Sequence, residues 1–213
     1  GSELEHQWRH AYAAHAANRF EYSPAAKGAR RLRTVSLGYL AASGASDAPK
    51  MAKKQFDQAD NMTDRQGALG ILANSEAEER EQALAGFYMR YRGDALVLDK
   101  WFTVQALSTR DDTLERVKAL AGHPDFTLSN PNRLRALVGS FAANQRAFHG
   151  ASGEGYRFLA DMILAVDRSN PQVAARLVPP LGGGRRFDEG RAEVMEADAC
   201  KNRLSVAACA DQG

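Results

Sequence analysis

The sequence has 213 residues, of which 44% are apolar and 25% are charged, a balance that fits one globular domain or two small ones and excludes a disordered chain. Its 28 basic and 26 acidic residues are mixed along the chain and leave a net charge of +2, so a nucleic-acid-binding stripe and a basic membrane-binding arm are not indicated. No stretch has the pattern of a spanning helix or of a signal peptide.

The chain opens with Gly1 and Ser2 in place of a methionine, which is typical of an expression-tag remnant. A helix is expected from about Leu4, and it carries His6 and His10 at the separation that two zinc ligands need. The order is not His-Glu-x-x-His, however, and the sequence offers no third ligand. We therefore predict no metal site on this chain.

Helical spacing of apolar residues continues through most of the chain, and no alternating strand pattern competes with it. The clearest buried stripes are Leu84, Phe87, Tyr88 and Tyr91, then Leu134, Leu137, Val138 and Phe141, then Leu159, Met162, Ile163 and Val166. Trp101 and Phe102 are interpreted as core residues.

Two kinds of signal mark where helices begin. Pro in the first helical turn predicts starts at Pro24, Pro131 and Pro171, because its missing N–H is not needed there. Reciprocal capping pairs are predicted for Thr63 with Gln66 and for Ser75 with Glu78. Short turns at residues 43–47, 92–94, 150–155 and 182–184 separate helices of about 10 to 18 residues, so neighbouring helices should pack antiparallel.

One internal repeat is visible in this all-α pattern. "SNPNRLRALV" from Ser129 and "SNPQVAARLV" from Ser169 begin 40 residues apart, about one armadillo or HEAT hairpin. The repeat predicts two helix starts that face the same way, with Arg135 and Arg176 at similar heights along them.

The arginines of the first of these helices, Arg133 and Arg135, lie near a helix N-terminus, where a positive charge is unfavourable. One interpretation is functional: two parallel helix starts with free N–H groups and added guanidinium groups of Arg135 and Arg176 would bind an anion such as a carboxylate. The other is structural: the arginines pair with acidic residues of neighbouring helices or lie along the surface.

Other candidate sites are weaker. Gly182 to Gly184 before Arg185 and Arg186 lack the Lys-Ser/Thr and the preceding strand of a phosphate-binding loop. The spacing of Cys200 and Cys209 fits neither zinc nor a redox pair, so we expect reduced thiols in a cytoplasmic protein. The sequence shows no self-sufficient catalytic set.

Three segments are similar to a known family. "KQFDQADNMTDRQGAL" from Lys54, "LVLDKWFTVQA" from Leu96 and "HPDFTLSNPNRLRALVGSFAANQRAFHGASGEGYRFLADMILAVDRSNPQVAARLVPPL" from His123 together resemble the C-terminal helical domain of bacterial aminopeptidase N, a zinc-dependent alanyl aminopeptidase. The resemblance extends from about Tyr22 to about Arg191. The tail at residues 192–213 does not resemble the usual closing helix of the family.

The resemblance implies a right-handed superhelix of antiparallel helix pairs, and residues 1–213 would then be part of the C-terminal domain of a larger enzyme. The family's Gly-Ala-Met-Glu-Asn segment and its zinc-binding His-Glu-x-x-His are not in this sequence. Catalytic residues and zinc are therefore expected in an absent catalytic domain, and the fragment alone is expected to be inactive.

By resemblance, this domain closes a chamber in which peptides lose residues from their N-terminus. Arg135 and Arg176 would face the chamber, and Gln172 would lie near the pocket for the leading side chain. The implied partners are the catalytic domain of the same chain and peptide substrates, with no nucleic acid and no membrane. The alternative from the repeat alone is a helical scaffold that binds other proteins.

Overall fold

The computed structural model describes residues 2–17, 19–186, 188, 190–191 and 193–195. In this part of the chain all regular structure is helical and strands are absent, which confirms the predicted all-α class. The chain divides into two compact units, unit 1 (Gly1–Asp94) and unit 2 (Ala95–Gly213). The division falls at the predicted turn of residues 92–94.

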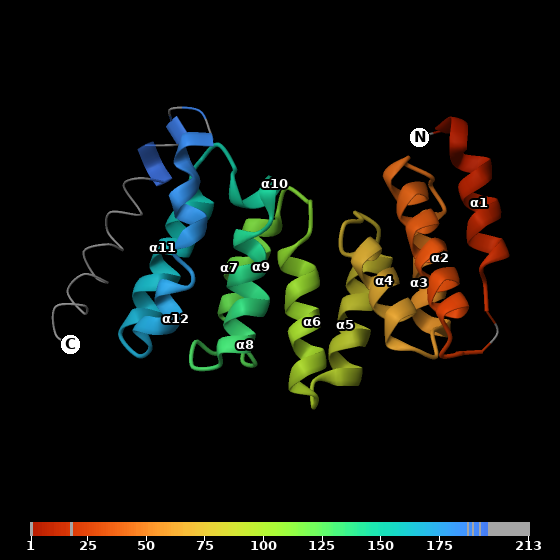
Figure 1. Ribbon diagram of the computed structural model, residues 1–213, viewed down its shortest axis with the longest axis horizontal. Coiled ribbons are helices and arrows are strands. Elements are labelled where there is room, and N and C mark those ends of the chain that lie inside the picture. The colour runs from red at the N-terminus through yellow and green to blue at the C-terminus, as the bar shows by residue number, and fades with distance from the viewer. Residues whose placement is uncertain (1, 18, 187, 189, 192, 196–213) are drawn as a thin grey trace. The chain divides into compact units, whose positions relative to one another are not determined.

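Unit 1 is built from helix pairs that follow one another in chain order (Figure 1). α1 packs on α2, α3 packs on α4, and α5 contacts both α3 and α4. Leu37, Leu69 and Phe87 are among the fully buried side chains of its core. The elements of unit 1 are η1 (Ser2–Leu4), α1 (Glu5–Ala14), α2 (Pro24–Ala42), α3 (Ala48–Gln58), α4 (Met62–Leu72) and α5 (Glu79–Tyr91).

Unit 2 contains a helix of three consecutive segments, α8, η2 and α9, and the middle segment η2 is π-helical. η2 packs on α6 and α7, and α11 packs on α12. The predicted stripe from Leu134 to Phe141 is buried, as are Trp101 and Phe102. The elements of unit 2 are α6 (Ala95–Ala106), α7 (Thr113–Ala121), α8 (Pro131–Leu134), η2 (Arg135–Gly139), α9 (Ser140–Ala142), α10 (Gln145–Phe148), α11 (Glu154–Asp167), α12 (Pro171–Ala175) and η3 (Pro179–Arg186).

The predicted proline starts are confirmed, because α2, α8 and α12 each begin at their proline. Both predicted capping pairs are wrong. α4 is capped by Asn61, whose side chain accepts from the N–H of Asp64 at 2.9 Å, two residues earlier than Thr63 would cap it. Ser75 accepts from the N–H of Ala77 at 3.0 Å and so closes a turn ahead of α5.

Buried arginines satisfy carbonyl groups where the helices of unit 1 end. Arg65 on α4 donates to the carbonyls of Phe56 and Ala59 at the end of α3. Arg80 on α5 donates through Nε to the carbonyl of Ala73, just after α4, at 3.3 Å. The last carbonyls of a helix have no partner within the helix, so these donors allow the helix ends to be buried.

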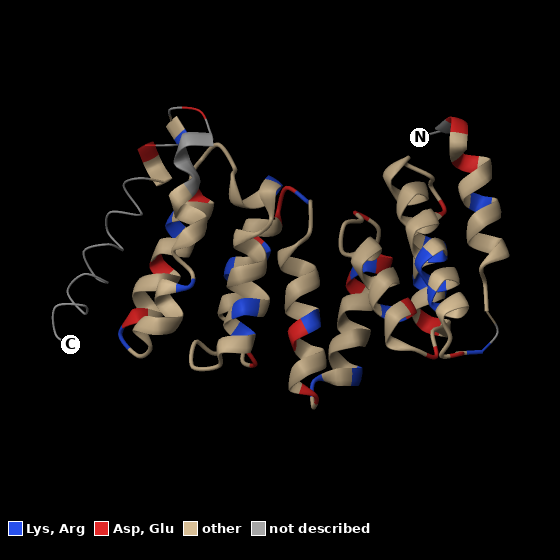
Figure 2. Cartoon of the chain, in the orientation of Figure 1, with Lys and Arg blue, Asp and Glu red and all other residues tan. Residues whose placement is uncertain are grey.

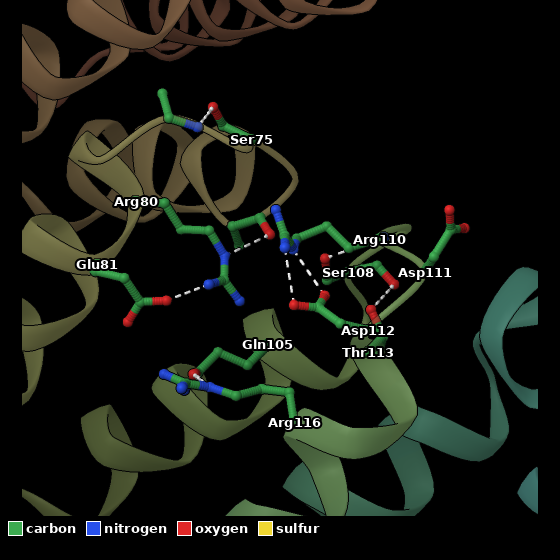
Figure 3. Close-up of polar contacts among 12 residues, drawn as sticks. Ser75, Arg80, Glu81, Gln105, Ser108, Arg110, Asp111, Asp112, Thr113 and Arg116 are labelled. Atoms are coloured by element: carbon green, nitrogen blue, oxygen red, sulfur yellow. Dashed lines mark hydrogen bonds and ion pairs between the residues drawn. The ribbon is translucent and has the colours of Figure 1, made fainter.

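Unit 2 uses neutral side chains for the same purpose at the end of α6. The buried amide of Asn144 donates to the carbonyls of Ala106 at 3.0 Å and Ser108 at 2.7 Å. The Thr113 hydroxyl also donates to the Ser108 carbonyl, at 3.0 Å (Figure 3). These bonds join the turn after α6 to α7 and to the start of α10.

Gly155, near the start of α11, lies directly against the backbone at the end of α10. A Cβ atom there would collide with the carbonyl oxygen of Phe148 and would lie 3.2 Å from its Cα. We predict that Gly155→Ala lowers the free energy of unfolding of unit 2 by about 2 kcal/mol, because the clash is with backbone and not with a movable side chain.

Urea unfolding followed by circular dichroism would measure this loss. Gly122→Ala is the matched control, since its Cβ would make an ordinary 3.5 Å contact with the Ala119 carbonyl oxygen. The control should change the stability by less than about 0.5 kcal/mol. Equal stabilities of the two variants would contradict the prediction.

Candidate functional site

Arg133 lies in the first turn of α8 and is only 5% exposed. Its Nε donates to Asp99 at 2.5 Å, and its other nitrogens donate to the carbonyl of Asp125 and, at 3.3 Å, to that of Ala95. The guanidinium group also lies 4.8 Å from the centre of the Phe102 ring. The structural interpretation is therefore correct for Arg133, which fastens α8 to α6 and is not available to a ligand.

Arg135 follows two residues later and is exposed. Its Nη1 donates to the side-chain oxygen of Asn132 at 3.4 Å, one turn earlier in the chain. Its aliphatic stem lies over Gly139, where a Cβ atom would be 3.3 Å from Arg135 Cγ. Arg135 thus presents its guanidinium group at the surface while its stem is held against the helix.

The π-helical segment η2 begins at Arg135. The Thr103 hydroxyl of α6 donates to the Ala136 carbonyl at 3.1 Å, and the Ser140 hydroxyl donates to the Arg135 carbonyl at 3.4 Å. Side chains inserted in this way are a recognised cause of distorted helix turns, and π turns are frequent at functional sites. No local pattern in the sequence marks Thr103; the signal for Gly139 is a glycine four residues after Arg135 in an otherwise apolar helix.

Gln172 and Arg176 lie at the two ends of α12, and both are exposed. Asn170 caps this helix by accepting from the N–H of Val173 at 3.1 Å. In Figure 1, α12 and α8 both start at the lower end of unit 2, as the repeat predicts.

The expectation of free N–H groups at these helix starts is wrong in part. Asn130 Oδ1 already accepts from the N–H groups of Asn132 at 3.0 Å and Arg133 at 3.3 Å, and Asn170 Oδ1 accepts from the N–H of Val173 at the start of α12. A side-chain cap occupies the groups that would otherwise bind an anion. An anion would therefore have to be held by the exposed guanidinium groups.

The wider surface carries both signs of charge. Figure 2, in which the ribbon is coloured by residue type, shows basic and acidic residues intermingled along the helices of each unit, which agrees with the mixed order of charges in the sequence. Mixed charge favours local recognition by particular arginines over a broad field.

Within the described ranges, no group of three or more His, Cys, Asp and Glu side chains could hold a metal ion. His6 and His10 are both exposed on α1. The described residues thus do not fit a zinc site. Among those same residues, none of the helices is both long and apolar enough to cross a membrane.

A family of helical domains matches residues 1–201, and it is described as a domain of unknown function, DUF3458_C, with ARM repeats. The chain belongs to this family. The ARM-repeat description agrees with the predicted class of helical repeat, and the similarities that follow confirm the predicted resemblance to bacterial aminopeptidase N.

Aminopeptidase N from several bacteria is similar to this chain. The identity is 44% over 178 residues for *Haemophilus influenzae*, 47% over 179 for *Caulobacter vibrioides* and 41% over 180 for *Escherichia coli*, covering 83% to 84% of this chain. The chain spans only about a fifth of each relative, 20%, 21% and 20% respectively.

A solved structure shows the same fold. Aminopeptidase A of *Legionella pneumophila*, crystallised in complex with aspartic acid, superposes with a TM-score of 0.85 at 30% identity. The superposition covers 100% of this chain and 27% of that one.

The match to the DUF3458_C family continues past α12 into a segment that packs on α10 and the start of α11 within unit 2. Arg191 Nε donates to the carbonyl of His149 at 2.9 Å, and Met195 is fully buried. A Cβ atom on Gly153 would lie 2.8 Å from Val194, so this segment approaches the backbone closely. Of the tail from residue 192 onward, only residues 193–195 are described; Cys200 and Cys209 lie outside the described residues.

His149 lies beneath this segment at the end of α10. Its Nδ1 is 3.0 Å from the hydroxyl of the buried Tyr156. Burial, and then the positive charge of Arg191, lower the pKa of His149 below its ordinary value, whereas burial raises the pKa of Tyr156. The structure therefore favours neutral His149, although its place at a helix C-terminus would favour a cation.

We predict that Arg133→Met destabilises unit 2 by about 3 kcal/mol, because Asp99 would keep a half-buried charge without its cation. Arg135→Met, two residues away on the exposed side, should change the stability by less than about 0.5 kcal/mol. Urea unfolding of both variants measures the difference. Similar losses for the two would show that Arg133 is not the structural arginine.

His149 should make the stability of unit 2 depend on pH. Since its folded pKa lies below the ordinary 6.5, the unfolded chain takes up the proton first as the pH falls. The stability that neutral His149 contributes to unit 2 is fully present above about pH 6.5. It is lost as the pH falls from there toward the pKa of His149 in the folded chain. Asp188 and Arg191 also face this site, and hydrogen bonds from Arg191 lower the pKa of Asp188 below its ordinary value.

The measurement is urea unfolding at about pH 8 and about pH 5.5 for the wild type and for His149→Gln. The wild type should lose more stability between the two pH values than the variant does. An equal loss of stability in both proteins would show that His149 is not the source of the pH dependence.

Proposed function

We propose that this chain caps the catalytic chamber of a zinc-dependent aminopeptidase, contributes to substrate binding there and carries no catalytic residue of its own. The observation that carries the proposal is the family match over residues 1–201, supported by relatives that are aminopeptidases. The whole enzyme would remove amino acids one at a time from the N-terminus of peptides. The activity belongs to the parent chain, of which this domain would be the C-terminal part.

Arg135 and Arg176 are the residues proposed to hold the far end of a peptide. Both guanidinium groups are exposed, whereas Arg133 of the same helix as Arg135 is occupied by Asp99. A peptide's C-terminal carboxylate accepts charge-assisted hydrogen bonds from arginine, which are about twice as strong as neutral ones. Gln172, exposed at the start of α12, is proposed to lie near the pocket for the leading side chain.

The described residues do not fit zinc, so the metal of the proposed enzyme would be held by the catalytic domain. A zinc ion supplies Lewis-acid activation of the scissile carbonyl and of water in such enzymes. The contribution of this chain is to orient the peptide and to keep bulk water and large substrates out. Its proposed partners are the catalytic domain and peptides in the cytoplasm, without nucleic acid or membrane.

The alternative, a helical scaffold for other proteins, is less well supported. It would be favoured if the repeat arginines were buried in ion pairs, because they would then be unavailable to a small anion. Arg133 is bound in that way, but Arg135 and Arg176 are exposed.

In the full-length enzyme, Arg135→Ala and Arg176→Ala should each lower kcat/KM for peptides by about 10-fold, the loss expected for one charge-assisted hydrogen bond. Amino-acid anilides have no far carboxylate, so their kcat/KM should change little. Steady-state kinetics on Ala-p-nitroanilide and on an alanyl peptide provide the comparison.

Arg133→Lys is the matched control, since a buried arginine should affect stability without distinguishing the two substrate classes. The 213-residue chain alone should release no p-nitroaniline. Equal losses of kcat/KM on peptide and anilide would count against the proposed binding of a carboxylate by these arginines. Release of p-nitroaniline by the isolated chain in the presence of a chelator would refute the proposal that the catalytic residues lie in another domain.

A further inference from the structure

The helix that carries Arg135 is wider than an α-helix in the turn that begins at Arg135. Over Arg135–Gly139 the turn is π-helical, and the N–H of Ser140 reaches back five residues to the Arg135 carbonyl. Two hydroxyl groups bond to carbonyls of this turn: Thr103 to Ala136 at 3.1 Å and Ser140 to Arg135 at 3.4 Å. The hydroxyls of Thr103 and Ser140 are themselves 3.5 Å apart.

The widened turn changes which side chains lie near Arg135. It brings position 139 so close that a Cβ there would be 3.8 Å from Arg135 Cβ and 3.3 Å from Cγ. The 3.3 Å contact is shorter than nine in ten real Cβ contacts, so a residue larger than glycine would push the arginine stem away by a few tenths of an ångström. The stem therefore rests on Gly139 while Nη1 reaches Asn132 at 3.4 Å.

We propose that Gly139 and Thr103 are positioning residues for Arg135. Thr103 stabilises the π turn from α6, and the π turn places Gly139 beneath the arginine, so that the guanidinium group takes one direction over α8. The functional consequence of this positioning rests on the proposed role of Arg135 in holding peptides; the positioning itself does not.

The direct test measures the Arg135 side chain in the 213-residue chain by NMR. The Nε–Hε signal of Arg135 is assigned by its loss in Arg135→Lys. Gly139→Ala should shift this signal and lower its heteronuclear NOE, because the stem loses its resting place. Thr103→Val keeps the side-chain shape without the hydroxyl and should act in the same direction.

Gly122→Ala serves as the control, because its Cβ makes only an ordinary contact, and it should leave the Arg135 signal unchanged. If Gly139→Ala does not fold, Thr103→Val decides the matter alone. An Arg135 signal identical to wild type in the folded variants overturns the proposal.

The enzymatic test uses a double-mutant cycle in the full-length enzyme. Gly139→Ala should lower kcat/KM for peptides by roughly 3- to 10-fold, the cost of an off-rotamer side chain, and leave the anilide unchanged. Because Gly139 acts through Arg135, the double variant with Arg135→Ala should be no worse than Arg135→Ala alone. Additive losses would overturn the proposal.

The experiments distinguish a failure of the proposed carboxylate binding by Arg135 from a failure of its proposed positioning. If Arg135→Ala weakens peptides and anilides equally, the carboxylate role fails, while a shifted NMR signal still supports the positioning. If Arg135→Ala is selective for peptides but Gly139→Ala leaves both the signal and the peptide kinetics unchanged, the function survives and the positioning proposal is wrong.

Discussion

Both units depend on buried side-chain donors that satisfy the carbonyl groups left without partners where short helices end. Arg65 and Arg80 do this in unit 1, and Asn144 does it in unit 2. A fold made of many short helices has many such ends, and each unsatisfied buried carbonyl costs about 1–3 kcal/mol. These three buried side chains are therefore part of the stability of the unit in which each lies.

That constraint separates two arginines that look equivalent in the sequence. Arg133 and Arg135 are two residues apart, so they leave the helix about 200° from each other. One faces α6, where Asp99 neutralises it; the other faces outward and rests on Gly139. A repeat helix can thus use one arginine to attach itself to its neighbour and still present a second at its surface.

The proposed role in an aminopeptidase follows from family membership together with this division. A domain that supplies positive groups and excludes bulk water affects how peptides are bound and oriented, while the bond-breaking chemistry lies in the rest of the enzyme. In the proposed arrangement, the π turn under Arg135 would hold a long, flexible side chain in one direction. Pre-organisation of this kind lowers the entropy that binding must overcome.

Local patterns in the sequence correctly predicted the all-α class, the three proline helix starts and the buried stripe from Leu134 to Phe141, because each rests on residues within a few positions of one another. The capping pair of Thr63 with Gln66 failed because a second capping residue lies two positions earlier: Asn61 and Thr63 can both cap, and α4 begins after Asn61. The sequence by itself determined that arginines recur at the two Asn-Pro helices. Only the tertiary structure decided which of them is buried, because the partner of Arg133 lies 34 residues away on α6, beyond the reach of any local pattern.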